Sequence, residues 1–171
     1  MQFRRRSLLL AATLGAGTSL LAACGNDDDD HDRNIVQEAQ SRPDFSILVE
    51  AVVAADLTAT LSGTGPFTVF APTNAAFAAL LTELGTTKEA LLANKPLLTT
   101  VLTYHVLAGK VLKAQVPVGT PITTLQGSTF TVGSDLVITD ASGRRSAIVA
   151  TDIETTNGVI HAIDKVLLPA V

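Results

Sequence analysis

The hydrophobic pattern of the chain changes from helical to extended near Gly109, and this change limits the possible folds more than any other feature. Before Gly109, apolar residues recur at helical spacing, except for residues 67–71, a β-branched and aromatic run typical of a strand. After Gly109, short β-branched runs alternate with turn residues. Helices followed by a series of strands predict an α+β domain.

Four helices are expected in the N-terminal half. The first carries a stripe formed by Phe45, Leu48, Val49, Val52 and Val53. The second begins at Thr73 or Asn74, either of which can cap it, and ends at Gly85. Thr86 and Glu89 have the spacing of a capping box, which predicts a third helix through Leu92. The fourth has Pro96 in its first turn and a stripe formed by Leu97, Leu98, Val101, Leu102 and His105.

The C-terminal half is expected to hold short strands joined by tight turns. The predicted strands are residues 111–116, 122–125, 129–132, 136–139, 147–153 and 159–163. Residues 133–135 and 141–143 suit hairpin connections. Asn157-Gly158 is the strongest turn signal, because both residue types tolerate a positive φ.

The N-terminus has the pattern of a secretory signal peptide. Three arginines, Arg4 to Arg6, precede an uncharged apolar run that ends in Leu21-Ala22-Ala23-Cys24. The run is short for a membrane-spanning helix, which needs about 20 apolar residues. Its last four residues resemble a lipobox, the site at which bacteria attach diacylglycerol to a cysteine. We therefore expect residues 1–23 to be a signal peptide, exported by either the general or the twin-arginine route.

The expected lipid anchor is on Cys24, which is the only cysteine in the chain and so cannot form an intramolecular disulfide. Two acyl chains would hold the protein durably on a membrane, since each buried methylene contributes about 0.8 kcal/mol. The predicted location is the cell envelope, either periplasmic or surface-exposed.

An acidic segment follows the expected cleavage site. Removing residues 1–23 takes away three arginines and no acids, so the formal charge falls from −4 to −7. Residues 24–33 include Asp27 to Asp30 and His31 and are expected to form a disordered, solvated tether. A metal site there is the weaker interpretation, because nothing would fix the ligands. No basic cluster indicates nucleic-acid binding.

Three segments resemble those of the fasciclin domain family. They are FTVFAPTNAAF at residues 67–77, LTYHVL at 102–107 and NGVIHAIDKVLLP at 157–169. Their order and spacing also resemble the family, over residues 34–171. The resemblance implies a β-wedge of two sheets with an N-terminal set of packed helices. It also makes Thr73, Asn74, Asn157, Gly158 and His161 residues that identify the fold.

The resemblance implies a partner-binding role for Tyr104 and His105, because the family's tyrosine-histidine segment is tied to adhesion. The residues themselves favour a structural role, since His105 shares the apolar stripe of its predicted helix. Both interpretations remain open at this stage.

Catalysis is not expected. His161, Asp164 and Asp152 could form an acid–base group, but His161 and Asp164 should point to opposite faces of a regular strand. The chain has no nucleophile elbow, zinc-protease motif or phosphate loop, and its three histidines lack metal-ligand spacing. We expect no enzyme activity, no cofactor and no metal.

The sequence therefore predicts a lipid-anchored binding or adhesion module whose partner is an extracellular protein or matrix component. The alternative is a carrier of a small apolar ligand such as a carotenoid or a lipid. The chain has six Phe, one Tyr and no Trp, which gives a polyene few aromatic rings to stack on.

Overall fold

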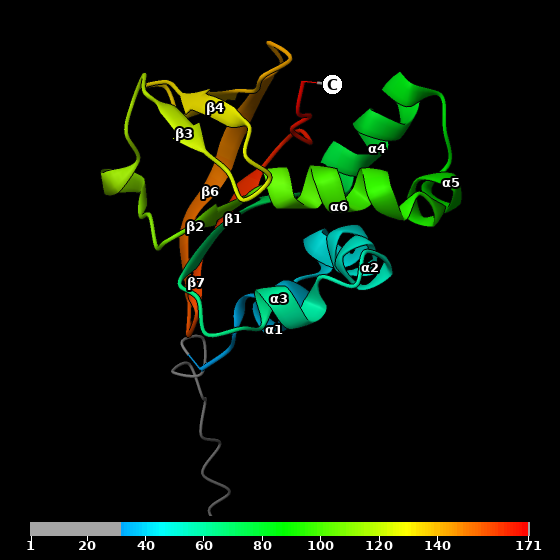
Figure 1. Cartoon of the computed structure of the whole chain (residues 1–171), viewed down its shortest axis with the longest axis horizontal. Helices are drawn as coiled ribbons and strands as arrows, with labels where there is room; N and C mark the ends of the chain where they lie inside the picture. The colour runs from blue at the N-terminus through cyan, green and yellow to red at the C-terminus, as the bar shows by residue number, and fades with distance from the viewer. Residues whose placement is uncertain (1–31, 171) are drawn as a thin grey trace, which may run out of the picture.

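The computed structural model describes residues 32–170 (Figure 1). The expected leader, Cys24 and nearly all of the tether lie outside these residues. The helices are α1 (Ile35–Ser41), α2 (Ser46–Ala54), α3 (Thr58–Leu61), α4 (Asn74–Leu84), α5 (Lys88–Ala93) and α6 (Lys95–Tyr104), with short 3₁₀ turns at Pro43–Phe45 and Lys113–Gln115. The strands are β1 (Phe67–Pro72), β2 (Val106–Ala108), β3 (Pro121–Thr123), β4 (Thr129–Val132), β5 (Val137–Thr139), β6 (Arg145–Thr155) and β7 (Gly158–Ile163). The predicted α+β class is confirmed.

The strands form one sheet in the order β2-β1-β7-β6-β5-β4-β3. All neighbouring pairs are antiparallel except β1 and β7, which run parallel although they are the first and last strands in the chain. The sheet curves until its two edges approach each other, and the backbone N–H of Leu125 donates to the carbonyl of Val106 at 2.8 Å.

The two expected sheets are two arms of this single sheet, and β6 belongs to both. Its N-terminal end pairs with β5, from Arg145 to Ala147, and most of the remainder pairs with β7. Register shifts between Ile148 and Ile153 bend the strand between these regions. Figure 1 shows β6 as the long strand that passes from one arm to the other.

Strands β1 and β7 are buried on both faces. Val69 and Ala71 of β1 face a core shared with the helices, whereas Phe70 faces a second core enclosed by the curved sheet. Strand β7 divides in the same way, with Ile160 in the first core and Ile163 in the second. A parallel pair covered on both sides is the arrangement in which near-continuous apolar strands are stable.

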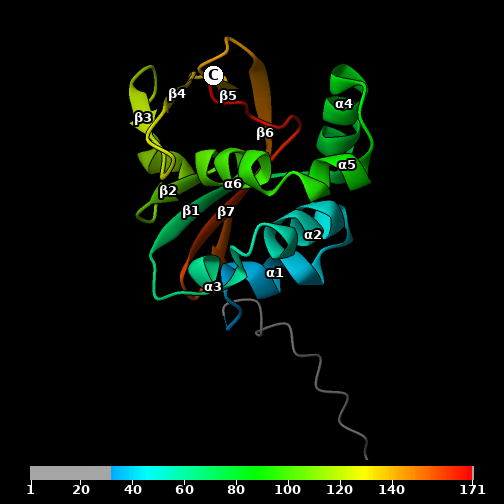
Figure 2. The same ribbon diagram turned by 45° about the vertical axis from the view of Figure 1, so that its right-hand side comes forward.

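The helices cover the first core. Figure 2 shows α6 crossing in front of the sheet, with α1 to α3 below it and α4 and α5 to one side. Side-chain caps begin several of them, including Asn34 on α1, Thr73 on α4 and Thr87 on α5. The capping box predicted at Thr86 is therefore wrong by one residue: Thr87 is the cap, and α5 runs from Lys88 to Ala93.

The strand predicted at residues 111–116 is not formed. Two N–H groups of this segment are taken by side chains of other strands, because Val111 donates to Thr68 and Lys113 donates to Asp152, each at 2.8 Å. A 3₁₀ turn at Lys113–Gln115 replaces the strand. Conversely, β2 was not predicted, because three residues directly after a helix give too short a pattern to recognise.

Among residues 32–170, no helix is both long and apolar enough to cross a bilayer.

Candidate functional site

Tyr104 is fully buried at the C-terminal end of α6. Its hydroxyl donates to the carbonyl of Thr129 at 2.9 Å and accepts from the N–H of Ala141 at 3.0 Å. The ring packs edge-on against Phe130, with centroids 6.1 Å apart. Burial raises the pKa of Tyr104, because the phenolate would lose its hydration. The side chain thus joins α6 to β4 and to the β5–β6 turn.

His105 follows directly as the C-cap of α6 and is only 1% exposed. Its Nδ1 lies 2.7 Å from the carbonyl of Val101, and its Nε2 lies 2.9 Å from the N–H of Leu167. The carbonyl requires a proton on Nδ1 and the N–H requires a lone pair on Nε2, so the ring is neutral and in one tautomer. Burial lowers its pKa to about 4, although Val101 and Asp140 act in the opposite direction.

Asp140 is a second buried group that holds the C-terminal segment. Its carboxylate accepts from the N–H groups of Ser142 and Arg144 within its own turn and from the N–H of Leu168 at 3.0 Å. The sequence analysis did not single out Asp140, although an Asp before Ala-Ser-Gly is a common signal for this kind of turn.

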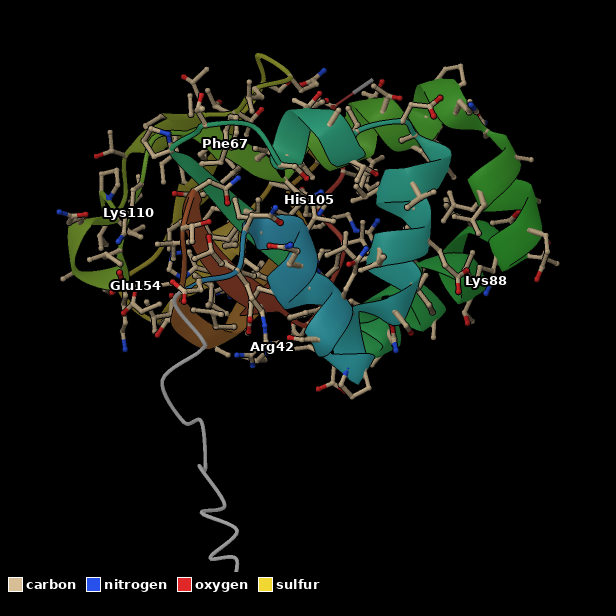
Figure 3. All side chains as sticks on the ribbon, turned by 90° about the horizontal axis from the view of Figure 1, so that it is seen from below. Arg42, Phe67, Lys88, His105, Lys110 and Glu154 are labelled. Atoms are coloured by element: carbon tan, nitrogen blue, oxygen red, sulfur yellow. The ribbon has the colours of Figure 1, made fainter. Side chains whose placement is uncertain are left out.

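Together, these contacts place Tyr104 and His105 in the core, with every polar side-chain atom bonded inside the molecule. Figure 3 shows His105 in the interior beside α1, while Lys88, Lys110 and Glu154 lie at the periphery. In the part of the chain that the structure describes, no buried side-chain nitrogen or oxygen lacks a hydrogen-bond partner. The structural role that the sequence favoured for this pair agrees with its position.

An apolar groove of about 490 Å³ lies beside this cluster. It is formed by α4, α5, α6, the β5–β6 turn and the C-terminal segment, and all but two of its lining residues are apolar. Its walls include Phe77, Leu80, Leu84, Leu97, Val101 and Leu168. We call it the α4–α6 groove. Its volume lies within the range of about 300–1,000 Å³ that small-molecule sites occupy.

A separate cavity lies between α1, α2 and the sheet. Its volume is about 30 Å³, and its apolar lining includes Val36, Leu48 and Ile160. A space of this size holds about one or two water-sized spheres. It is therefore too small for an extended ligand, and the α4–α6 groove is the larger of the two spaces.

Asn157 ties three separate segments together. Its side chain, in a residue only 7% exposed, accepts from the N–H of Ile35 at 2.9 Å and donates to the carbonyls of Leu61 and Gly63 at 2.8 and 2.9 Å. The predicted β6–β7 hairpin is confirmed, with Thr155 opposite Gly158. The predicted reason is wrong, however, because neither Asn157 nor Gly158 has a positive φ. Asn is needed here for its amide.

Gly158 is required by close packing. A Cβ atom at this position would overlap the backbone carbonyl of Phe67 on the neighbouring strand β1, and it would lie 2.9 Å from Cδ1 of Ile35. Only glycine lets the two strands approach this closely.

His161 is also a buried structural residue. Its Nε2 lies 2.9 Å from the carbonyl of Val111, and its Nδ1 accepts from the N–H of Asp152 at 3.3 Å. Asp164 instead binds the hydroxyl of Ser146 and the N–H of Ala147 at the other end of β6. His161 and Asp164 thus have separate partners and form no pair, as predicted, although Asp164 lies just after β7 and not within it.

Thr73 and Asn74 have different roles. Thr73 is the cap of α4 and accepts from the N–H of Ala76 at 3.4 Å. Asn74 links the start of α4 to the start of α2, since its amide donates to Pro43 and accepts from the N–H of Ile47. The two alternatives that the sequence left open are thereby resolved in favour of Thr73.

The described surface has largely paired charges. Seven of the lysines and arginines in residues 32–170 form ion pairs, for example Lys88 with Glu50 and Arg42 with the buried Glu38. The hydrogen bond from Lys88 to Glu50 raises the pKa of Lys88. Within the same range, no three His, Cys, Asp or Glu side chains lie close enough together to hold a metal ion.

The fold and these contacts define an α+β domain in which tyrosine, histidine and asparagine side chains fasten separate segments to a curved sheet. The family model of the fasciclin domain matches residues 43–169, so the chain belongs to this family. It is 47% identical over 138 residues to Protein sll1483 of Synechocystis sp., covering 79% of this chain and 73% of that protein. It is 39% identical over 139 residues to the immunogenic protein MPB70 of Mycobacterium bovis, covering 77% of this chain and 66% of that protein.

The fold is similar to that of a solved structure, a FAS1 domain pair from the insect cell adhesion molecule fasciclin I. The TM-score is 0.71 with 18% identity, over 80% of this chain and 51% of that one. The fold expected from the fasciclin resemblance is thus confirmed.

Proposed function

We propose that the chain is a non-catalytic binding module of the adhesion type, held at the cell envelope by a lipid on Cys24. Its membership of the fasciclin family over residues 43–169 carries this proposal. The similarity in fold to a domain pair from a cell adhesion molecule supports it. The proposed partner is an extracellular protein or matrix component.

The N-terminal sequence supports the anchoring part of the proposal. The expected leader covers residues 1–23 and ends just before Cys24. Arg33, near the start of the described residues, is bonded to the domain. The carbonyl of Arg33 accepts from Thr156, and the Arg33 guanidinium lies 3.7 Å from the buried carboxylate of Glu38. The acidic residues before Arg33 would then separate the domain from an anionic membrane by charge repulsion.

Tyr104 and His105 take part in partner binding, in this proposal, by fixing the surface around them. They hold the β5–β6 turn and the C-terminal segment, both of which have exposed residues such as Ser142 and Ala170. A partner would contact these segments rather than the two buried rings.

The absence of catalysis rests on the chemistry of the polar side chains. The two histidines of the domain are each held between two backbone groups, so neither has a free nitrogen to exchange protons with a substrate. The paired surface charges likewise give little attraction for nucleic acid.

A retention experiment tests the adhesion proposal. The full chain carrying Cys24→Ala is immobilised and exposed to washed native cell envelopes and to the surrounding medium. We expect an extracellular protein or matrix component to be retained and to bind again after it is purified alone. If no component from either source rebinds, the adhesion proposal is wrong.

A carrier of a small apolar ligand is the second candidate function. The α4–α6 groove is the observation that favours it, because its volume and lining are those of a small-molecule site.

A further inference from the structure

The α4–α6 groove has an interior suited to a hydrocarbon chain. Its two polar lining residues, Thr100 and Ser142, already have partners, since their hydroxyls donate to the carbonyls of Pro96 and Leu168. A hydrocarbon would therefore displace water from carbon surface without breaking hydrogen bonds that the ligand cannot replace. Burial of this kind is favourable in proportion to the apolar area that is removed from water.

A charged pair lies where α4 meets the β5–β6 turn, the two elements that contribute Leu84 and Ser142 to the groove. Arg144 binds the carboxylate of Glu83, the residue before Leu84. The side chains are 27% and 52% exposed respectively, so the pair is accessible from solvent. An arginine has five N–H donors, and one carboxylate engages at most two of them side by side. Arg144 thus has donors left for a second anion.

The groove lies far from the point where the tether joins the domain. Ser142 lies just before β6, and Arg33 is bonded to Thr156 just after it. The strand has 11 residues, which at about 3.3 Å per residue separates these points by roughly 30 Å. Figure 1 shows the C-terminal segment and α4 at one end of the molecule and α1 and α3 at the other. A ligand would enter this groove from the surroundings rather than from the bilayer that holds the tether.

We propose that the α4–α6 groove binds a single-chain carboxylate amphiphile, such as a free fatty acid. The alkyl chain lies along the apolar walls from α4 and α6, and Arg144 binds the carboxylate in competition with Glu83. This inference deepens the second candidate function and is independent of the adhesion proposal.

Calorimetric titration tests the ligand class. The full chain carrying Cys24→Ala is used, so that acyl groups on the cysteine cannot occupy the groove. Decanoate, dodecanoate and tetradecanoate are compared below their micelle concentrations. We expect saturable binding with one site, and about tenfold tighter binding for each two added methylenes. Binding that does not depend on chain length would overturn the proposal.

Matched variants test the site. Arg144→Gln should weaken the binding of dodecanoate at least severalfold and leave the binding of dodecanol unchanged. The control is Arg145→Gln, at the neighbouring exposed arginine that is paired with Asp135, and it should change neither affinity. Glu83→Gln should tighten the binding of dodecanoate, because the carboxylate that competes for Arg144 is gone. Equal effects of the two arginine substitutions would rule out Arg144 as the carboxylate partner.

A blocking substitution separates this groove from other sites. Thr100→Phe places a ring in the groove and should abolish binding, whereas Thr60→Phe, at an exposed position of α3, should not. If the folded Thr100→Phe protein still binds the fatty acids, the α4–α6 groove is not the binding site. A carrier role at another site would then remain. No binding of any of the three fatty acids would overturn the proposed ligand, whereas the carrier function fails only if a carotenoid and a neutral lipid also do not bind. Occupation by a second copy, seen as dimerisation that Thr100→Phe prevents, would also overturn the proposal.

Discussion

Nε2 of His105 accepts the N–H of Leu167 at 2.9 Å, although 62 positions separate the two residues in sequence. The opposite ring nitrogen, Nδ1, is bonded to Val101 in α6. The imidazole therefore joins the end of α6 to the C-terminal segment, and it does so only in its neutral form. A proton on Nε2 would remove the acceptor for Leu167 and place a positive charge in the core, where the loss of hydration outweighs the attraction of Asp140.

This geometry predicts that acid destabilises the domain. The pKa of His105 is about 4 when folded and near 6.5 when unfolded, so between these values the unfolded state binds a proton that the folded state does not. Stability should therefore fall as the pH drops through this window, by about 1.4 kcal/mol per pH unit and about 3 kcal/mol in total.

Denaturant unfolding at several pH values measures this slope. His105→Gln keeps an oxygen that can accept from Leu167, but its side chain cannot titrate. Between pH 6.5 and 4, the free energy of unfolding of this variant should therefore fall less steeply with pH, by about 1.4 kcal/mol per pH unit. Equal slopes in the two proteins would show that His105 does not titrate on unfolding.

Tyr104→Phe should destabilise the domain by about 1–2 kcal/mol. The ring packing against Phe130 is kept, but the carbonyl of Thr129 and the N–H of Ala141 lose their common partner. Thermal unfolding followed by circular dichroism measures the change. An unchanged midpoint would mean that water replaces the hydroxyl without loss.

Asn157→Ala should cost at least about 2 kcal/mol, because it leaves one N–H at the start of α1 and two carbonyls at the end of α3 without their partner. Asn94→Ala is the matched control, since Asn94 also bonds a backbone N–H, but only as the exposed cap of α6. The control should cost about 1 kcal/mol. Similar losses in the two variants would contradict the role given to Asn157.

Gly158→Ala should destabilise the domain by more than about 3 kcal/mol, since a methyl group would force β7 away from β1. Gly119→Ala adds a methyl group where no atom lies within 4 Å, so only the strain of its positive φ is expected, about 1 kcal/mol. Chemical denaturation compares the pair. If Gly158→Ala is no worse than Gly119→Ala, the strands do not approach as closely as described.

Cys24→Ala should move the exported protein from the membrane fraction to the soluble fraction, because the proposed anchor would be lost. Fractionation followed by mass spectrometry of the N-terminal peptide measures both location and modification. A variant that stays fully in the membrane fraction would refute the lipid anchor, while leaving the binding function of the domain open.

The sequence predicted the elements whose signal is local. The helix after Pro72 and the hairpin at Asn157-Gly158 were recognised because their capping and turn residues lie within a few positions of each other. The fasciclin resemblance then supplied the arrangement of helices and strands, which periodicity alone does not give.

The contacts that fix the candidate site could not be predicted in the same way. Asp140 and Leu168 are bonded across 28 positions, and Val111 and Thr68 across 43, so neither pair leaves a pattern in any short window. The second of these pairs is also the reason that residues 111–116 do not form the strand that their β-branched composition indicated. Likewise, the α4–α6 groove depends on how α4, α6 and the C-terminal segment pack, which no single segment encodes.

Because β1 and β7 have no solvent-facing side, the two strands most characteristic of the family have no free position at which a new specificity could evolve. Diversity among such domains must instead accumulate in the helices and in the connections between strands. An engineer who wished to graft a new recognition surface onto this scaffold would randomise the outer positions of α4 and α6 and the β5–β6 turn. The central pair of strands would be left untouched.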